Sequence, residues 1–437
     1  MSLEGLRSEF PALVPREGVR PPVYLDSACM SLVPRPVIAA MEEYYREYPG
    51  CAGRSVHRFA EEVSQRFEAA RDGFAQFLGA PDRAAVVFVR NATEAINLVG
   101  QGLSWKRGER VLVSDQEHNS NLVLWQRLAK ERGIRLEVLS LQDDGSFPSD
   151  AYEEALERGI RLVSFFHTSN LDGRSLPAKE IVDRAHDHGA LVLLDGAQSA
   201  AHRPVRLAEL GADYYALSAH KMLGPTGVGV LAAQPQALGE VAPLMSGGET
   251  VEWTTLTDHA LRPMPHRFEA GLQNYAGVLG AHAALRFLSA AGLEEISAHD
   301  LKLNERLTRA LSGEPRLRIL GPQAAGERPS IFAFALEGID PNDAALFLDE
   351  GYGVMVRSGR HCVHSWYESR GLSGNVRASL YLYNSVADVD ALVAGVRELI
   401  ERIPAGPSPP SAPERPANEA ATSARNSGGA ARRPRRR

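Results

Sequence analysis

The sequence contains little cysteine. Cys29, Cys51 and Cys362 are the only cysteines in 437 residues, they are widely spaced, and their number is odd. This usage excludes a disulfide framework and a CxxC metal site, and it fits a reducing compartment. We therefore expect neither structural disulfides nor a bound metal.

Long apolar runs are also absent. No run approaches the roughly 20 residues needed to cross a bilayer. The N-terminus lacks the basic flank and apolar core of a signal peptide, and the overall composition is that of an ordinary soluble chain, with 44% hydrophobic and 23% charged residues. We expect a cytoplasmic protein that does not associate with membranes.

Most of the chain lacks an excess of positive charge. The net charge is −6, and residues 404–437 hold seven arginines against two glutamates, a net +5, which leaves −11 for residues 1–403. An acidic body argues against nucleic acid as a partner. The tail at 404–437 is rich in Pro, Ala, Ser and Gly, so we expect it to be disordered. Its arginines are either simply solvated or tether the protein to an acidic partner or to nucleic acid.

The central part of the chain alternates between strand and helix patterns. Continuous apolar runs predict strands at 85–89, 111–114, 136–139, 162–166, 191–194, 214–217 and 228–232. Helical segments separate most of these runs. This pattern predicts an α/β domain with a mainly parallel sheet that helices cover on both faces.

The pattern changes near residue 274. Long helices are expected at 275–290 and 298–311, followed by strands near 330–336, 354–357 and 376–382 and a last helix at 386–402. We predict four regions: an N-terminal segment (1–20) that packs on the small domain, a large domain (21–273), a smaller C-terminal α+β domain (274–403) and the tail (404–437).

Polar residues gather where the predicted strands end. Lys221 follows the strand at 214–217 together with Ser218 and His220, and Asp195 ends the strand before it. Ligands of such sheets bind beyond the carboxyl ends of the strands. A lysine in this place is suited to form a Schiff base. A carboxylate in this place needs a cationic partner or a hydrogen-bond donor, and a protonated pyridine nitrogen is such a partner.

Other strand ends extend the pattern. Ala92 and Thr93 open a helix whose free N–H groups form an anion cradle. His118 follows the next strand, where an imidazole stacks on an aromatic ring or moves a proton, and Asn170 follows a third. Taken singly, these residues have structural explanations as a solvated lysine, a helix cap, a loop histidine or a turn aspartate. Taken together, they favour a site for pyridoxal 5′-phosphate (PLP).

With these residues in place, the chain resembles the class V aminotransferase family of fold-type I PLP enzymes. Within that family it is most similar to the cysteine desulfurase/selenocysteine lyase group. The resemblance covers about residues 20–400. It rests on motifs at residues 24–28 (YLDSA), 88–97 (FVRNATEAIN), 117–121 (EHNSN), 195–199 (DGAQS) and 218–221 (SAHK).

The resemblance implies roles for the residues at the matching positions. Lys221 is implied to bind PLP as a Schiff base, and Asp195 to pair with its ring nitrogen. The other implied contacts are His118 stacked on the ring, Gln198 on the ring hydroxyl, Ala92, Thr93, Ser218 and His220 at the phosphate, and Asn170 and Arg377 at the substrate carboxylate. The resemblance also implies a homodimer.

Cys362 stands where the desulfurases carry their nucleophile. The neighbouring Arg360 and His361 are expected to favour the reactive thiolate, and a buried, inert cysteine is the alternative. The resemblance implies that Lys221 removes the α-proton of L-cysteine and that Cys362 attacks the substrate sulfur. The products are then L-alanine and a persulfide on Cys362, which a sulfur-acceptor protein would discharge; selenocysteine would follow the same path.

Two positions depart from the family pattern. Arg360 stands where relatives often have a second histidine. Leu272 stands where relatives have a threonine that reaches the phosphate of the other subunit's cofactor, so Gln273 or backbone N–H groups take over or the contact is lost. Both departures leave room for another class V enzyme, an aminotransferase or β-lyase acting on a different amino acid. A cofactor-bearing binding protein without activity is the third possibility.

Overall fold

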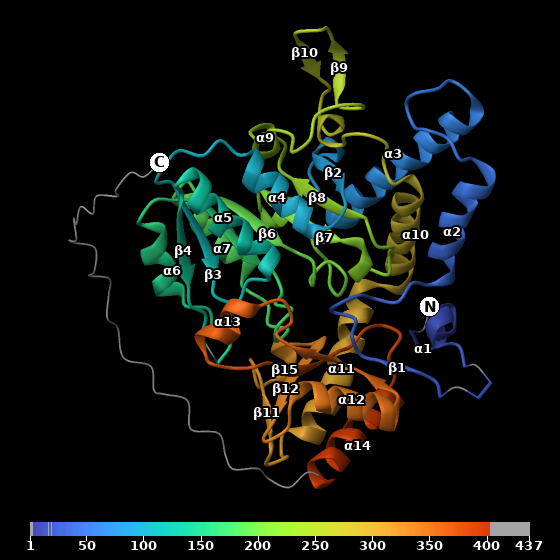
Figure 1. Cartoon of the computed structure of the whole chain (residues 1–437), viewed down its shortest axis with the longest axis vertical. Coiled ribbons are helices and arrows are strands. Elements are labelled where there is room, and N and C mark those ends of the chain that lie inside the picture. The colour runs from blue at the N-terminus through green and yellow to red at the C-terminus, as the bar shows by residue number, and fades with distance from the viewer. Residues whose placement is uncertain (1–2, 16, 19, 143, 403–437) are drawn as a thin grey trace, which may run out of the picture.

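The larger part of the molecule is built on a seven-stranded sheet (Figure 1). The computed structural model describes residues 3–15, 17–18, 20–142 and 144–402. The strand order is β2-β8-β7-β6-β5-β3-β4, and every pair is parallel except those that β8 makes with β2 and β7. The strands are β2 (Val86–Val89), β3 (Arg110–Ser114), β4 (Arg135–Leu139), β5 (Ile160–Phe166), β6 (Leu191–Asp195), β7 (Tyr214–Ser218) and β8 (Gly229–Ala233). The predicted α/β class and its mainly parallel sheet are confirmed.

Helices cover both faces of this sheet, which explains why its strands read as continuous apolar runs. One apolar core lies between the sheet and α3 (Arg58–Leu78), α6 (Ser149–Leu156), α7 (Ala178–Asp187) and α10 (Tyr275–Ala291). A second core lies on the other face, under α4 (Ala92–Gly102), α5 (Val123–Arg132) and α9 (Pro235–Gly239). Successive residues of β7 alternate between the two cores: Tyr215 joins the first and Tyr214 the second.

The C-terminal part contains a four-stranded antiparallel sheet in the order β11-β12-β15-β14. These strands are β11 (Leu317–Ile319), β12 (Ile331–Leu336), β14 (Arg357–Gly359) and β15 (Asn375–Ser379). Helices α11 (Leu293–Leu311), α12 (Pro341–Tyr352) and α14 (Val386–Arg402) share an apolar core with one face of this sheet. On the other face, the short helix α13 (His364–Ser369) contributes Trp366 and Tyr367 to a separate cluster.

The N-terminal segment joins this smaller part. Strand β1 (Val23–Tyr24) pairs in parallel with β13 (Val354–Met355). Upstream, Arg7 forms an ion pair with Asp388 of α14 at 2.6 Å. The two ends of the described chain are therefore fixed to each other next to the small sheet.

The predicted four-region division of the chain stays a prediction. Helix α10, which that division assigns to the small domain, packs against α3 and against α2 (Arg35–Glu47) in the core of the large sheet. The predicted tail lies outside the described residues. Within the part of the chain that the structure describes, no single helix is long and apolar enough to cross a bilayer; α10 and α11 pass such a test together, but they bend by 73° where they meet.

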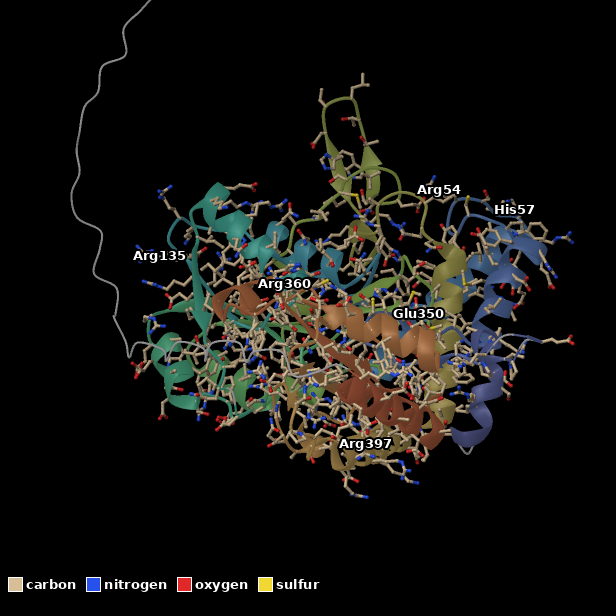
Figure 2. All side chains as sticks on the ribbon, turned by 60° about the horizontal axis from the view of Figure 1, so that its bottom comes forward. Arg54, His57, Arg135, Glu350, Arg360 and Arg397 are labelled. Carbon is tan, nitrogen blue, oxygen red and sulfur yellow. The ribbon has the colours of Figure 1, made fainter. Side chains whose placement is uncertain are left out.

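One surface feature was not predicted. A hairpin of β9 (Val251–Thr254) and β10 (His259–Leu261) projects from the large part of the molecule (Figure 1). Its strands are short and largely exposed, so they leave no apolar run in the sequence. The loop before α3 carries Arg54 and His57 at the edge of the molecule (Figure 2), where Arg54 pairs with Glu249 and His57 caps α3 through Nδ1.

Candidate active site

Asp195 and Lys221 come from neighbouring parallel strands whose carboxyl ends share one edge of the large sheet. Asp195 is the last residue of β6 and is 7% exposed. Its Oδ1 accepts a hydrogen bond from the Ala197 N–H at 3.0 Å. Burial raises the pKa of Asp195, and the charge of Lys221 opposes this only in part. Burial also lowers the pKa of Lys221, so its amine loses a proton more readily than a solvated lysine.

His118 is held as a neutral imidazole beside this pair. Its Nδ1 accepts a hydrogen bond from the Ser120 N–H at 3.1 Å, which leaves the ring proton on Nε2. Burial lowers the pKa of His118 to about 3, and the charge of Lys221 adds to the effect. The Ser120 hydroxyl lies 2.9 Å from the same Nδ1 and 2.7 Å from Oγ1 of Thr93. Thr93 and His118 are thus brought together by one serine.

The first turn of α4 lies against the end of β7. The Ala92 N–H donates to Oγ of Ser218 at 2.8 Å. A Cβ on Gly229 would lie 2.5 Å from the Cα of Asn91, so only glycine lets β8 come this close to the helix start. Helix N-termini of this kind favour anions. Burial lowers the pKa of the nearby His220 to about 4, so this side chain is neutral at physiological pH.

The loop after β1 closes the site from another side. Gln198 donates from Nε2 to the carbonyl oxygen of Ala28 at 2.8 Å. The Ser31 N–H donates to the carbonyl oxygen of His220 at 2.8 Å. Both hydrogen bonds join this loop to residues that the motifs singled out, so Gln198 and His220 lie against the same loop.

Arg377 is fully buried on β15, with an exposure of 0%. Its Nη1 donates to the carbonyl oxygen of Asn170 at 2.8 Å, and its Nη2 donates to Oδ1 of Asp26 at 3.2 Å. Among the described residues, its Nε has no hydrogen-bond partner. Burial lowers the pKa of Arg377. A buried guanidinium with a spare N–H is suited to receive a carboxylate.

Cys362 lies in a tight loop that hydrogen bonds from the large sheet's side hold in place. His361 and Cys362 have φ angles of 47° and 62°, a left-handed conformation that costs a non-glycine residue about 1–2 kcal/mol. The side-chain amide of Asn170 donates to the His361 carbonyl at 2.6 Å, and the Asn119 N–H donates to the Cys362 carbonyl at 2.7 Å. These two bonds offset the backbone strain and fix the position of the thiol.

The cation that meets the sulfur differs from the expected one. The Nη2 of Arg357 lies 3.4 Å from Sγ of Cys362. Arg360 instead pairs with Glu368. Burial lowers the pKa of His361 well below its ordinary value, so this ring carries no charge. The expectation that Arg360 and His361 favour the thiolate is therefore wrong, and Arg357 supplies the charge.

The role of Arg357 was not predicted, because the strand register that places it is seen only in the structure. Arg357 on β14 and Arg377 on β15 are Cα partners across the small sheet. Two arginines at matched register on neighbouring strands place two guanidinium groups on the same side of the sheet.

A buried acid beneath His118 was also missed. Glu117 has no exposed surface and accepts hydrogen bonds from the Ser114 hydroxyl at 2.6 Å, the Asn121 amide at 2.8 Å and the Phe166 N–H at 3.1 Å. Burial raises its pKa to about 8. This network fixes the loop that carries His118.

The position that departs from the family pattern lies at the surface. Leu272 is 60% exposed. The neighbouring Gln273 donates from Nε2 to the carbonyl oxygen of Ala270 at 3.3 Å, within its own loop. Leu272 thus presents an apolar side chain outward.

Known proteins resemble this chain over nearly its whole length. The profile of the family described as aminotransferase class-V matches residues 23–392. A probable cysteine desulfurase of Streptomyces coelicolor is 38% identical over 408 residues, which cover 91% of this chain and 97% of the relative. A cysteine desulfurase of Klebsiella pneumoniae is 38% identical over 404 residues, which cover 91% and 98%.

Solved structures agree with this similarity. The cysteine desulfurase of Thermococcus onnurineus NA1 superposes with a TM-score of 0.86 at 34% identity, over 92% of this chain and 98% of the other. The cysteine desulfurase CsdA of Escherichia coli superposes with a TM-score of 0.84 at 32% identity, over 92% of this chain and 99% of the other.

Proposed function

The chain belongs to the aminotransferase class-V family, and from this premise we propose that it is a PLP-dependent cysteine desulfurase. It removes sulfur from L-cysteine, releases L-alanine and keeps the sulfur as a persulfide on Cys362. The observation that carries this assignment is the Cys362 thiol, which Arg357 holds at 3.4 Å on a loop fixed to the region of Lys221 and Asp195.

The residues present fit PLP. Asp195 is a buried carboxylate whose pKa burial raises, so a cationic ring nitrogen beside it would stabilise both charges. The α4 N-terminus, with Ser218, suits a phosphate, and Lys221 provides the amine that attaches the cofactor. When bound, PLP supplies an electron-withdrawing ring that stabilises negative charge at the α-carbon of the substrate.

Side chains of the protein carry out proton transfer and bind the substrate carboxylate. The lowered pKa of Lys221 favours the neutral amine, whose Nζ accepts the α-proton of the substrate. The neutral His118 carries its proton on Nε2 and donates from there. Arg377 receives the substrate carboxylate through its unpartnered Nε.

Sulfur transfer belongs to Cys362. Its thiolate attacks the sulfur of the substrate, and the new S–S bond forms as the Cβ–S bond breaks. One proton is then added at Cβ and one is returned to Cα, which completes L-alanine. The Arg357 guanidinium donates to Sγ, so a positive charge lies beside the sulfur that attacks the substrate.

The test is to incubate the purified protein with L-cysteine and analyse the peptide that contains Cys362 by mass spectrometry. We expect one added sulfur atom on this peptide and release of L-alanine. Cys362→Ser should keep the visible absorbance of the cofactor but release no L-alanine, and Cys51→Ser should behave as the wild type. L-alanine release at an unchanged rate from Cys362→Ser, or transfer of an amino group to a keto acid without loss of sulfur, would reject the proposal.

The assembly and location are part of the same proposal. Met245, Trp253, Leu256 and Leu272 are exposed apolar side chains on one continuous segment, which suits a subunit contact in a homodimer. Light scattering after size-exclusion chromatography should give twice the mass of the chain, and a monomer would contradict this. The cytoplasm is the proposed compartment, since the three cysteines are unpaired. A protein thiol is the proposed acceptor of the sulfur.

A further inference from the structure

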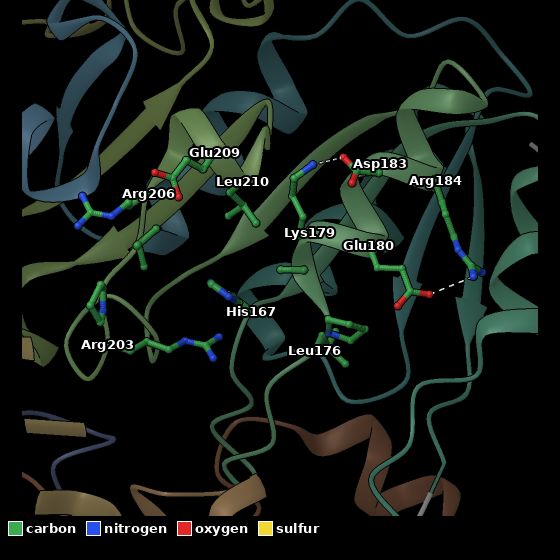
Figure 3. Close-up of a pocket in the computed structure, with 14 residues that line it drawn as sticks. His167, Leu176, Lys179, Glu180, Asp183, Arg184, Arg203, Arg206, Glu209 and Leu210 are labelled. Atoms are coloured by element: carbon green, nitrogen blue, oxygen red, sulfur yellow. Dashed lines mark hydrogen bonds and ion pairs between the residues drawn. The ribbon is translucent and has the colours of Figure 1, made fainter. Parts of the chain in front are cut away.

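A cavity separate from the Lys221 site lies on the face of the large sheet that α7 covers (Figure 3). It has a volume of about 1040 Å³ and runs between α7 and the segment that leads into the short helix α8 (Leu207–Leu210). Much of its lining is apolar, and no residue of the Lys221 site lines it. The apolar lining residues are Leu176, Pro177, Ala178, Pro204, Val205 and Leu210. The size and character of the lining are those of a small-molecule site.

Arg203 enters this cavity as an unpaired cation. Its Nε and Nη2 are buried, and neither has a hydrogen-bond partner among the described residues. Burial lowers its pKa, and the group that opposes this effect is Tyr215 rather than a carboxylate. Unpaired buried charges are costly by several kcal/mol, so proteins rarely keep one without a use.

The other charged residues of the cavity do not neutralise Arg203. Lys179 pairs with Asp183, and Glu180 pairs with Arg184 at 3.1 Å. Figure 3 shows both pairs along α7, apart from the Arg203 guanidinium. Glu209 and Arg206 also line the cavity, and Figure 3 shows both on the α8 side of it, apart from the Arg203 guanidinium. Among the described residues, no carboxylate forms an ion pair with Arg203.

The two N–H donors of Arg203 that have no partner determine which kind of anion fits beside it. Nε and Nη2 form one edge of the guanidinium, and their N–H bonds are parallel, which matches the two oxygens of a carboxylate. His167 lines the same cavity, and burial lowers its pKa well below the ordinary value. Its Nδ1 lies 3.1 Å from the hydroxyl of Tyr215. With His167 neutral, the charged lining residues are Lys179, Arg184, Arg203 and Arg206 against Glu180, Asp183 and Glu209, an excess of one positive charge that matches an anion of charge −1.

We propose that this cavity, named here the Arg203 pocket, binds a small monocarboxylate with an apolar body. Nε and Nη2 of Arg203 grip the carboxylate, and the apolar lining around Leu176 and Val205 covers the rest of the ligand. The inference is independent of the desulfurase reaction because the pocket shares none of the residues assigned to that reaction.

Titration calorimetry of the full-length, cofactor-loaded protein with octanoate tests this proposal. Octanoate should bind saturably at one site per chain. Octanamide, which has the same body without the charge, should bind at least about tenfold more weakly, because a hydrogen-bonded charge pair is lost. Octanoate should bind Arg203→Met with the same loss of affinity. The loss should be intermediate for Arg203→Lys, which keeps the positive charge but not the two parallel N–H donors.

Arg206→Met is the matched control. Arg206 lines the same cavity, but its guanidinium points away from the centre in Figure 3. Its removal should change octanoate affinity by less than about twofold. Octanoate should also raise the melting temperature of the wild type and leave that of Arg203→Met unchanged, which separates a binding defect from misfolding. Absence of octanoate binding to the wild type, or equal affinity of Arg203→Met and Arg206→Met, would overturn the proposal.

Discussion

The guanidinium of Arg357 donates from Nη2 to the Sγ of Cys362 over 3.4 Å. A charged donor at this distance stabilises the thiolate, which is the form that reacts with electrophiles. Arg357→Met should therefore slow the alkylation of Cys362 by iodoacetamide at neutral pH by about tenfold. The rate is measured on the Cys362 peptide by mass spectrometry, without substrate.

Arg360→Met is the matched control for this experiment, since Arg360 lies closer in sequence but pairs with Glu368. Its alkylation rate should stay within about twofold of the wild type. If both variants slowed alkylation equally, general electrostatics rather than the contact of Arg357 would explain the effect.

Asp195→Asn should separate cofactor binding from turnover. The amide fills the same space and keeps an oxygen for the Ala197 N–H, but it removes the charge that a cationic ring nitrogen requires. We expect the absorbance of bound PLP to remain and L-alanine release to fall by about a hundredfold or more. Asp187→Asn, at the far end of α7, should leave both unchanged; full turnover of Asp195→Asn would exclude the charge pairing.

Glu117 should make stability depend on pH. Its pKa is about 8 in the folded protein against an ordinary value of 4.5, so the folded state binds this proton more tightly than the unfolded state. The stabilising contribution is therefore full below about pH 4.5 and is lost as the pH rises towards 8. The free energy of unfolding of the wild type relative to Glu117→Gln, measured in urea at several pH values, should decrease over this window. If the difference in unfolding free energy between the wild type and Glu117→Gln did not change with pH, the raised pKa of Glu117 would be contradicted.

Glu269 should be important for stability rather than chemistry. It accepts hydrogen bonds from both terminal nitrogens of the buried Arg71, at 2.7 and 2.9 Å, and from the Phe88 N–H at 2.8 Å. Glu269→Gln leaves the Arg71 charge buried without its main partner, which should lower the free energy of unfolding by about 3–5 kcal/mol. Glu62→Gln breaks the exposed pair with Arg66 and should cost less than about 1 kcal/mol. Similar losses in the two variants would refute this difference.

The large sheet and the positions of Asp195 and Lys221 could be predicted from the sequence for one physical reason. Continuous apolar runs separated by helices indicate parallel strands, and parallel strands end at the same edge. Residues that follow these strands must then meet, whatever the details of the loops. The seven predicted strands all occur, with bounds that differ by two residues or fewer.

The contacts inside the loops could not be predicted in the same way. Which arginine meets Cys362 depends on left-handed turns at His361 and Cys362, and neither residue is a glycine that would have signalled them. Two hydrogen bonds from distant parts of the chain stabilise those turns. A local pattern carries no information about such partners.

The surroundings of Glu117 and of helix α10 could not be predicted from the sequence either. Glu117 lies within a polar motif, yet it is wholly enclosed, since the distant Phe166 of β5 joins its sequence neighbours Ser114 and Asn121 as a partner. Helix α10 is apolar around much of its surface, which indicates burial but not the core that receives it. Arg203 gave no signal at all, because an unpaired guanidinium is recognised only when its surroundings are known.

The pairing of β1 with β13 has a consequence for how the molecule is made. Val23 and Tyr24 leave the ribosome long before their partners Val354 and Met355 are translated. Until then the first strand has no ladder to join, and Asp26, which continues it, cannot reach Arg377. The nascent polypeptide therefore fixes Arg377, the proposed ligand of the substrate carboxylate, only after the small sheet has been synthesised.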